Sequence, residues 1–135
     1  MKIMVDSNIV IFAVLFPHGY VSLALMFALE DDTVIIPQNV KDEVLHVSEK
    51  KFPDKVDDVI KFIESGLFVI ENPKYSDVEL DVSIRDVKDV PVFLSAKAIG
   101  VDVLMTGDKD LLEIHCRKTM ILSPKEYLLV KNKLS

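Results

Sequence analysis

Short apolar runs alternate with longer stretches of helical periodicity along this 135-residue chain. Runs that are rich in Val and Ile and apolar on both faces are typical of strands in a parallel sheet. The runs that predict strands are Lys2–Val5, Thr33–Ile36, Leu67–Ile70, Val103–Met105 and Thr119–Leu122. Strands that alternate with helices predict one α/β domain over residues 1–135, with a central parallel sheet and helices on both faces.

The segments between these strands carry apolar residues at the spacing of one helical face. The predicted helices are Ser7–Phe16, Tyr20–Leu29, Pro37–Lys50, Asp54–Ser65, Val90–Ile99, Lys109–Ile114 and a last helix from Pro124. Pro17 and Gly66 end two of these helices, and Gly100 caps a third. The segment Asn72–Asp86 has weak periodicity and the acids Asp77, Glu79, Asp81 and Asp86, which predict a loop or a short-helix excursion.

Composition narrows the class of protein. Hydrophobic residues make up 50% of the chain and charged residues 28%, as in a globular domain. Charges such as Asp6 interrupt every apolar stretch, so we expect neither a membrane span nor a signal peptide. Cys116 is the single cysteine, which excludes an internal disulfide and favours a reducing, cytoplasmic location. The net charge of −6 argues against broad nonspecific nucleic-acid binding, but a nuclease can approach phosphate through a bound metal.

Two aspartates directly follow predicted strands. Asp6 ends the run Lys2–Val5, and Asp108 comes shortly after Val103–Met105. In an open parallel sheet, ligands bind beyond the carboxyl ends of the strands, so these two residues are expected to be neighbours in space. Each could alone be only an N-cap of the helix that follows it. Together, on one edge of the sheet, they favour a site.

Two further acids complete the candidate site. Glu43 lies among Val40, Val44 and Val47 at helical spacing, so its side chain is expected along the apolar face; alternatively, its stem packs there while its carboxylate reaches solvent. Asp89 precedes Val90–Ile99 and could be a helix cap.

Carboxylates that converge on one pocket repel each other unless a cation lies among them. A divalent metal site follows, and an oxygen-only ligand set suits Mg²⁺ or Mn²⁺. The secondary candidates are the acids Asp86 and Asp110 and the short polar residues Ser7, Asn8 and Thr106, which could ligate or orient groups, or merely solvate, cap and form turns.

The sequence around these acids resembles the motifs of PIN-domain ribonucleases. Val5-Asp6-Ser7-Asn8-Ile9 is similar to their opening motif, and Thr106-Gly107-Asp108-Lys109-Asp110-Leu111-Leu112 to their late motif. Asp86-Val87-Lys88-Asp89, before a helix that carries Ala96 and Ala98, is similar to the third acidic block. Pro37-Gln38-Asn39-Val40-Lys41-Asp42-Glu43-Val44 fits the second block more loosely.

The resemblance implies an α/β/α sandwich with Asp6, Glu43, Asp89 and Asp108 around one or two Mg²⁺ or Mn²⁺ ions. It also implies cleavage of single-stranded RNA, and many such proteins are toxins of type II toxin–antitoxin pairs that an antitoxin peptide silences. We expect Asp6, Asp89 and Asp108 to hold metal, and Glu43 to orient or deprotonate the attacking water, because an apolar surround raises its pKa. The apolar surface of the first two helices, from Ile9 to Leu29, predicts a homodimer.

Two alternatives stay open at this point. A haloacid-dehalogenase-like phosphatase also has an aspartate after its first strand and a late Gly-Asp motif. It needs Asp-x-Asp, however, and Asn8 occupies the second position here. The other alternative is a PIN-like binding module that has lost activity.

Overall fold

The computed structural model describes residues 1–75, 78–80 and 82–133. Its helices are α1 (Ser7–Leu15), α2 (Tyr20–Asp31), α3 (Gln38–Lys51), α4 (Val56–Ile63), α5 (Asp89–Ile99), α6 (Lys109–Leu112) and α7 (Pro124–Val130), with a 3₁₀ turn at Pro53–Lys55. Its strands are β1 (Lys2–Val5), β2 (Thr33–Pro37), β3 (Val69–Glu71), β4 (Val103–Met105) and β5 (Met120–Leu122). Each predicted element is present, with small shifts at its ends.

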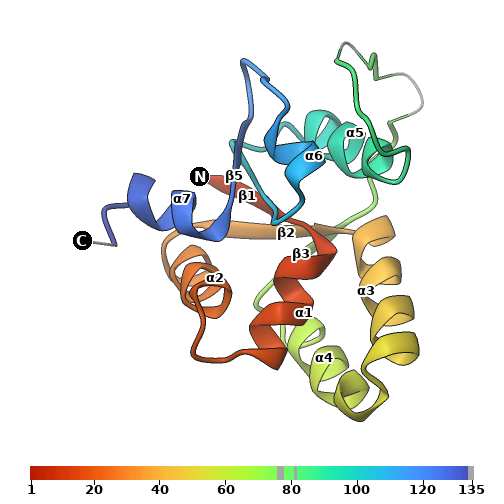
Figure 1. Ribbon diagram of the computed structural model, residues 1–135, viewed down its shortest axis with the longest axis vertical. Helices are drawn as coiled ribbons and strands as arrows, with labels where there is room; N and C mark the ends of the chain where they lie inside the picture. Colours follow the sequence, from red (N-terminus) through yellow and green to blue (C-terminus); the bar gives the residue numbers. More distant parts are fainter. Residues whose placement is uncertain (76–77, 81, 134–135) are drawn as a thin grey trace.

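The strands form one parallel sheet in the order β3-β2-β1-β4-β5. β1 is the central strand, and the chain builds β2 and β3 on one side of it before it crosses over to β4 and β5. The helices α1 to α4 lie on one face of the sheet, and α5 and α6 lie on the opposite face (Figure 1). The α/β/α sandwich predicted from the sequence is therefore confirmed. The change in strand order between β1 and β4 marks the position where such sheets bind ligands.

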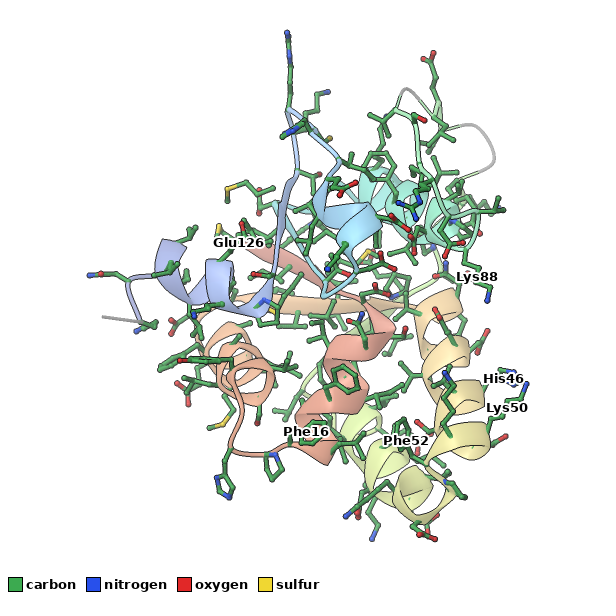
Figure 2. The ribbon with its side chains drawn as sticks, in the orientation of Figure 1. Phe16, His46, Lys50, Phe52, Lys88 and Glu126 are labelled. Atoms are coloured by element: carbon green, nitrogen blue, oxygen red, sulfur yellow. The ribbon has the colours of Figure 1, made fainter. Side chains whose placement is uncertain are left out.

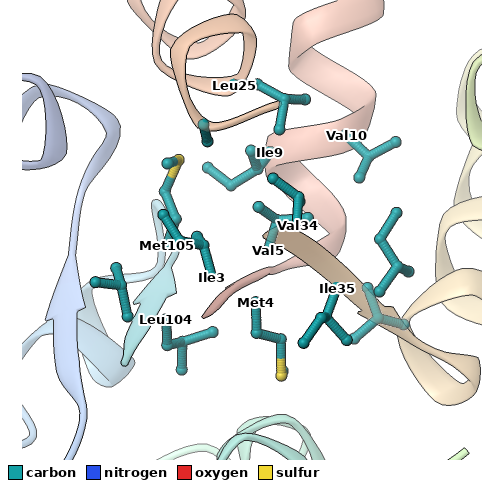
Figure 3. Packing of buried hydrophobic residues seen from close by; sticks show 14 of the residues in the cluster. Ile3, Met4, Val5, Ile9, Val10, Leu25, Val34, Ile35, Leu104 and Met105 are labelled. Atoms are coloured by element: carbon teal, nitrogen blue, oxygen red, sulfur yellow. The ribbon is translucent and has the colours of Figure 1, made fainter. Parts of the chain in front are cut away.

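The core fills both faces of the sheet because the strands are apolar on both sides. Met4, Leu104 and Ile35 point toward one face, while Ile9 of α1 and Leu25 of α2 cover the other (Figure 3). All five side chains are almost completely buried. Burial of this kind fixes the strand ends, and therefore the residues that directly follow them.

Two of the shifted element ends have a clear physical reason. β3 begins at Val69 because its pairing with β2 starts at Ile35, while Phe68 turns into the core and packs edge-to-face against Phe62 at 5.0 Å between ring centroids. Pro37 ends β2 and is the N-cap of α3, since its extended backbone is suited to a strand end.

The acidic segment after β3 has no helix or strand at residues 72–75, 78–80 and 82–86, as expected for a loop. Asp77 and Asp81 lie outside the described residues. Across the described parts of the chain, no single helix is both long and apolar enough to span a membrane.

Candidate functional site

The candidate site begins at the carboxyl ends of the neighbouring strands β1 and β4. The backbone N–H of Asp6 donates to the carbonyl of Met105 at 3.0 Å, which extends the ladder by one residue beyond β1. The next residue of each strand is therefore held at the same edge of the sheet. This is the edge at which strand order changes, as the sequence predicted for Asp6 and Asp108.

Thr106 links the two strand ends through its side chain. Its hydroxyl donates to Oδ2 of Asp6 at 2.8 Å. Oγ1 of Thr106 also accepts from the backbone N–H of Asp108 at 3.0 Å. Oδ1 of Asp6 accepts from the N–H of Ser7 at 2.8 Å. Asp6 and Thr106 are both buried, so these bonds satisfy polar groups that water cannot reach.

Burial is the main influence on Asp6. Desolvation raises the pKa of its carboxyl above the ordinary value, while the hydrogen bonds from Thr106 and Ser7 oppose the rise. The charge of Asp108 adds a repulsion that also raises this pKa. A cation beside Asp6 would favour the ionised form.

Asp108 and Asn8 fix the turn between β4 and α6. Asp108 is the N-cap of α6, and its Oδ1 accepts from the N–H of Asp110 at 2.8 Å. Oδ1 of Asn8 accepts from the N–H of Gly107 at 3.4 Å, which ties the start of α1 to the same turn. The capping role that the sequence allowed for Asp6 and Asp108 is thus real, and it coexists with their placement at one edge.

Asp89 reaches the site from the opposite side. It is the first residue of α5, with Lys88 as the N-cap, so Asp89 is not the cap that the sequence allowed. Its side chain is 6% exposed, and its Oδ2 has no hydrogen-bond partner among the described residues. A buried carboxylate oxygen without a partner is costly, and a cation would satisfy it.

The charges around Asp89 perturb its protonation strongly. Burial first, and then repulsion from Asp108 and Asp86, raise the pKa of Asp89 to about 7.

Glu43 comes from α3, across the groove from α1. The residue is exposed overall, but its side chain lines the same pocket as Asp6. Partial desolvation and the charge of Asp6 raise its pKa, while Ser7 and Lys88 oppose the rise. It combines the two predicted possibilities, since its stem packs along the pocket and its carboxylate remains accessible.

The four predicted acids share one pocket of about 300 Å³. Its lining residues are Asp6, Ser7, Asn8, Ile11, Phe12, Glu43, Val47, Lys51, Phe52, Lys88, Asp89, Val92 and Asp108. The sequence analysis missed two lysines and two phenylalanines on its rim. One signal for Lys51 was present, because Glu43, Val47 and Lys51 recur every four residues on one face of α3. Lys88 lies toward the N-terminal end of α3, and Phe52 follows its C-terminal end (Figure 2).

The secondary acids form a tighter group beside this pocket. Carboxylate oxygens of Asp86, Asp89 and Asp110 lie within 4.8 Å of one another. Arg85 approaches Asp110 at 3.9 Å, and its side chain is largely exposed. Asp89 is therefore common to two sets of acids: it lines the pocket with Asp6 and Asp108, and it forms a group with Asp86 and Asp110.

A larger pocket of about 590 Å³ lies elsewhere, against His115, Arg117 and Thr119, and contains none of the predicted site acids. Its size alone gives it no chemistry, so the acidic pocket is the better candidate.

Comparisons with known proteins bear on the fold. No protein-family model matches the sequence, and no curated protein does. A chain in the crystal structure of VapBC2 from Rickettsia felis bound to a DNA fragment from their promoter is similar in structure, with a TM-score of 0.68. The two chains are 18% identical, and the match covers 91% of this chain and 98% of that chain. The PIN-like fold that the motifs implied is confirmed at the level of architecture.

Proposed function

We propose that this protein is a Mg²⁺- or Mn²⁺-dependent endoribonuclease that cleaves single-stranded RNA and acts as the toxin component of a toxin–antitoxin pair. The observation that carries the proposal is the convergence of Asp6, Glu43, Asp89 and Asp108 on one pocket at the switch in strand order. These acids come from four separate elements or their ends. Structural stability alone gives no reason to gather like charges in one place.

The residues present fit a hard divalent cation. Every candidate donor is a carboxylate, hydroxyl or amide oxygen, and no described residue forms a hydrogen bond with the buried Oδ2 of Asp89. Asp6, Asp89 and Asp108 would hold the ion, with Asp86 and Asp110 available to a second ion beside Asp89. A bound divalent ion supplies charge stabilisation for the phosphodiester and lowers the pKa of water.

The chain's own residues supply positioning and proton transfer. Thr106 and Ser7 hold the carboxylate of Asp6 in one orientation through both of its oxygens. Glu43, with its raised pKa, accepts the proton of the attacking water, since a carboxylate of higher basicity is a better general base. Asn8 bridges to the Gly107 turn rather than offering the second aspartate that a dehalogenase-like phosphatase requires.

The partners follow from the same proposal. The similar chain comes from a structure named VapBC2, and on this basis we propose that an antitoxin protein binds the present chain as well. We also propose a homodimer, because α2 and the turn after α4 expose Leu23, Met26 and Leu67. The single cysteine fits a cytoplasmic location.

The test is cleavage of a labelled single-stranded oligoribonucleotide in Mn²⁺, with and without chelator. The wild type should cleave only when metal is present, and Asp108→Asn and Glu43→Gln should each abolish cleavage. Asn at position 108 keeps a side-chain oxygen for the N-cap, so this variant removes the charge and leaves α6 capped. Urea melts of both variants should therefore match the wild type closely.

Three outcomes would contradict the proposal. Cleavage that persists in chelator, or in both variants, would reject the mechanism. Hydrolysis of a phosphomonoester without RNA cleavage would favour the phosphatase. A folded wild type with no activity in Mg²⁺ or Mn²⁺ would favour the inactive binding module.

A further inference from the structure

The acidic pocket is one end of a groove between α1 and α3. Glu43, Val47 and Lys51 line one wall at intervals of four residues, and Asn8 and Phe12 line the other at the same interval. Residues four apart on a helix lie above one another on one face, so each wall is a straight stripe. From Glu43 to Lys51 the helix rises about 12 Å, at roughly 1.5 Å per residue. The groove therefore extends well beyond the acids.

The chemistry changes along the length of this groove. The end at the sheet is acidic, whereas the far end carries Phe12, Lys51 and Phe52. Phe12 is an aromatic side chain that is nevertheless 42% exposed. Its ring packs edge-to-face against Phe16, with 5.9 Å between centroids, and this contact orients the ring. An oriented, exposed aromatic ring next to a groove is a surface on which a nucleobase can stack.

Lys51 supplies a positive charge that could bind a phosphate at this end of the groove. Within the described part of the chain its ammonium group makes no hydrogen bond or ion pair, and it projects at the C-terminal end of α3. The protein has a net charge of −6, so a lysine without an acidic partner beside an acidic pocket stands out electrostatically. A phosphate is the anion that a nucleic acid would bring to this position.

Resting on the ribonuclease function proposed above, we propose that the Phe12–Lys51 end of the groove binds the nucleotide next to the cleaved phosphodiester. The base stacks on Phe12, and the phosphate contacts the ammonium group of Lys51. Stacking on a protein ring needs a base that is not stacked within a helix, so this end of the groove selects single-stranded RNA over a duplex. Phe12 and Lys51 are thus positioning residues, separate from the acids that carry out the reaction.

The first experiment measures steady-state cleavage of a labelled oligoribonucleotide in Mn²⁺. Phe12→Leu keeps an apolar side chain and removes the ring, while Lys51→Gln removes the charge. Each should raise KM by about tenfold, as expected for loss of one stacked base or one phosphate contact, with little change in kcat. Phe12→Trp and Lys51→Arg should restore the wild-type KM.

Matched controls come from outside the groove. Tyr20 is an exposed aromatic residue, and Lys61 is an exposed lysine on α4; neither lines the pocket. Tyr20→Leu and Lys61→Gln should leave KM unchanged. A KM that moves equally in these controls would overturn the assignment of the groove.

The second experiment measures binding, so that it does not depend on turnover. Anisotropy titrations of the oligoribonucleotide onto Glu43→Gln protein in Mn²⁺ would be repeated over a range of salt concentrations. Adding Lys51→Gln should reduce the slope of log K against log salt by about 0.7, the value for one phosphate contact on a single strand. Adding Phe12→Leu should weaken binding without changing that slope, and should not affect binding of the annealed duplex.

The two proposals fail in different ways. Wild-type cleavage with an unchanged KM and salt slope in both groove variants would overturn the groove assignment while the ribonuclease stands. Such insensitivity is also the result expected if the groove holds a peptide instead of RNA. A wild type that shows no metal-dependent cleavage would reject the ribonuclease function. If RNA binding is still weakened by the Phe12 and Lys51 substitutions, the assignment of the groove as an RNA-binding site would stand.

Discussion

The hydroxyl of Thr106 donates to Oδ2 of Asp6 at 2.8 Å, across a separation of 100 residues in the sequence. Because Oγ1 of Thr106 also accepts from the N–H of Asp108, one threonine contacts two candidate metal ligands. Thr106 is fully buried, so water cannot replace either hydrogen bond. The orientation of Asp6 therefore depends on the residue that directly follows the neighbouring strand β4.

Replacement of Thr106 tests this relationship. Thr106→Val keeps the shape of the side chain but leaves a buried carboxylate oxygen without its donor. We expect a loss of about 1–3 kcal/mol in the free energy of unfolding, measured by urea melts without metal. Thr106→Ser retains the hydroxyl and should lose much less. Equal losses in both variants would show that packing of the methyl group, rather than the hydrogen bond, matters here.

Added metal should stabilise the fold. Because a divalent ion relieves repulsion among the carboxylates, Mn²⁺ or Mg²⁺ should raise the Tm of the wild type, by the equivalent of about 2.7 kcal/mol at a hundredfold excess over Kd. Asp6→Asn combined with Asp108→Asn should abolish this gain. Asp57→Asn combined with Asp58→Asn, at exposed positions of α4, should retain it. A wild type indifferent to millimolar Mn²⁺ would remove the metal site.

A second pair of variants separates the two acid sets that share Asp89. If Asp6 and Asp108 are the primary ligands, Asp86→Asn combined with Asp110→Asn should keep most of the Tm gain in Mn²⁺. The opposite result would assign the ion to the tighter group of Asp86, Asp89 and Asp110. Isothermal titration of Mn²⁺ into both double variants would also give the number of ions bound.

The raised pKa of Asp89 predicts a pH dependence. Folding raises this pKa from 3.8 to about 7, so the folded protein holds a proton that the unfolded chain releases. Without metal, the contribution of Asp89 to stability should be present below about pH 4 and should be lost as the pH rises to about 7. Asp89→Asn should flatten this part of the curve of unfolding free energy against pH.

Metal binding should show the opposite trend. An ion binds the ionised carboxylate, so it competes with the proton on Asp89. Between pH 5 and 7 the affinity for Mn²⁺ should increase by at most about tenfold per pH unit, the limit for one displaced proton, and then level off. An affinity that does not change over this range would contradict ligation by Asp89.

The molar mass in solution tests whether the protein is a homodimer. Light scattering at micromolar concentration should give twice 15.2 kDa for the wild type. Met26 is 54% exposed on α2, and Met26→Glu should yield a monomer without loss of fold, because a charge is tolerated in water but not in an apolar interface. Lys50→Glu, at an exposed position of α3, is the control that should remain dimeric. A wild-type monomer would exclude the dimer.

The sequence by itself determined the order of strands and helices, because each element depends on periodicity within a few residues. The run Lys2–Val5 is predicted to be a strand from its apolar residues, and Gly100 is predicted to end the helix α5, where it adopts the left-handed conformation. The positions of Asp6 and Asp108 at one edge also followed, since parallel strands place their carboxyl ends together. These predictions needed no knowledge of distant contacts.

Only the tertiary structure decided which hydrogen bonds hold the site residues and which residues surround them. The Thr106–Asp6 bond and the pocket that Phe12 and Lys51 both line bring together segments far apart in the chain, and the burial of the Asp89 oxygen depends on such contacts. Residue spacing along one helix shows which side chains share its face, but not which other helix that face meets. The pKa of Asp89 depends on the same packing, because its burial and its proximity to the charge of Asp108 arise only when α5 meets the end of β4.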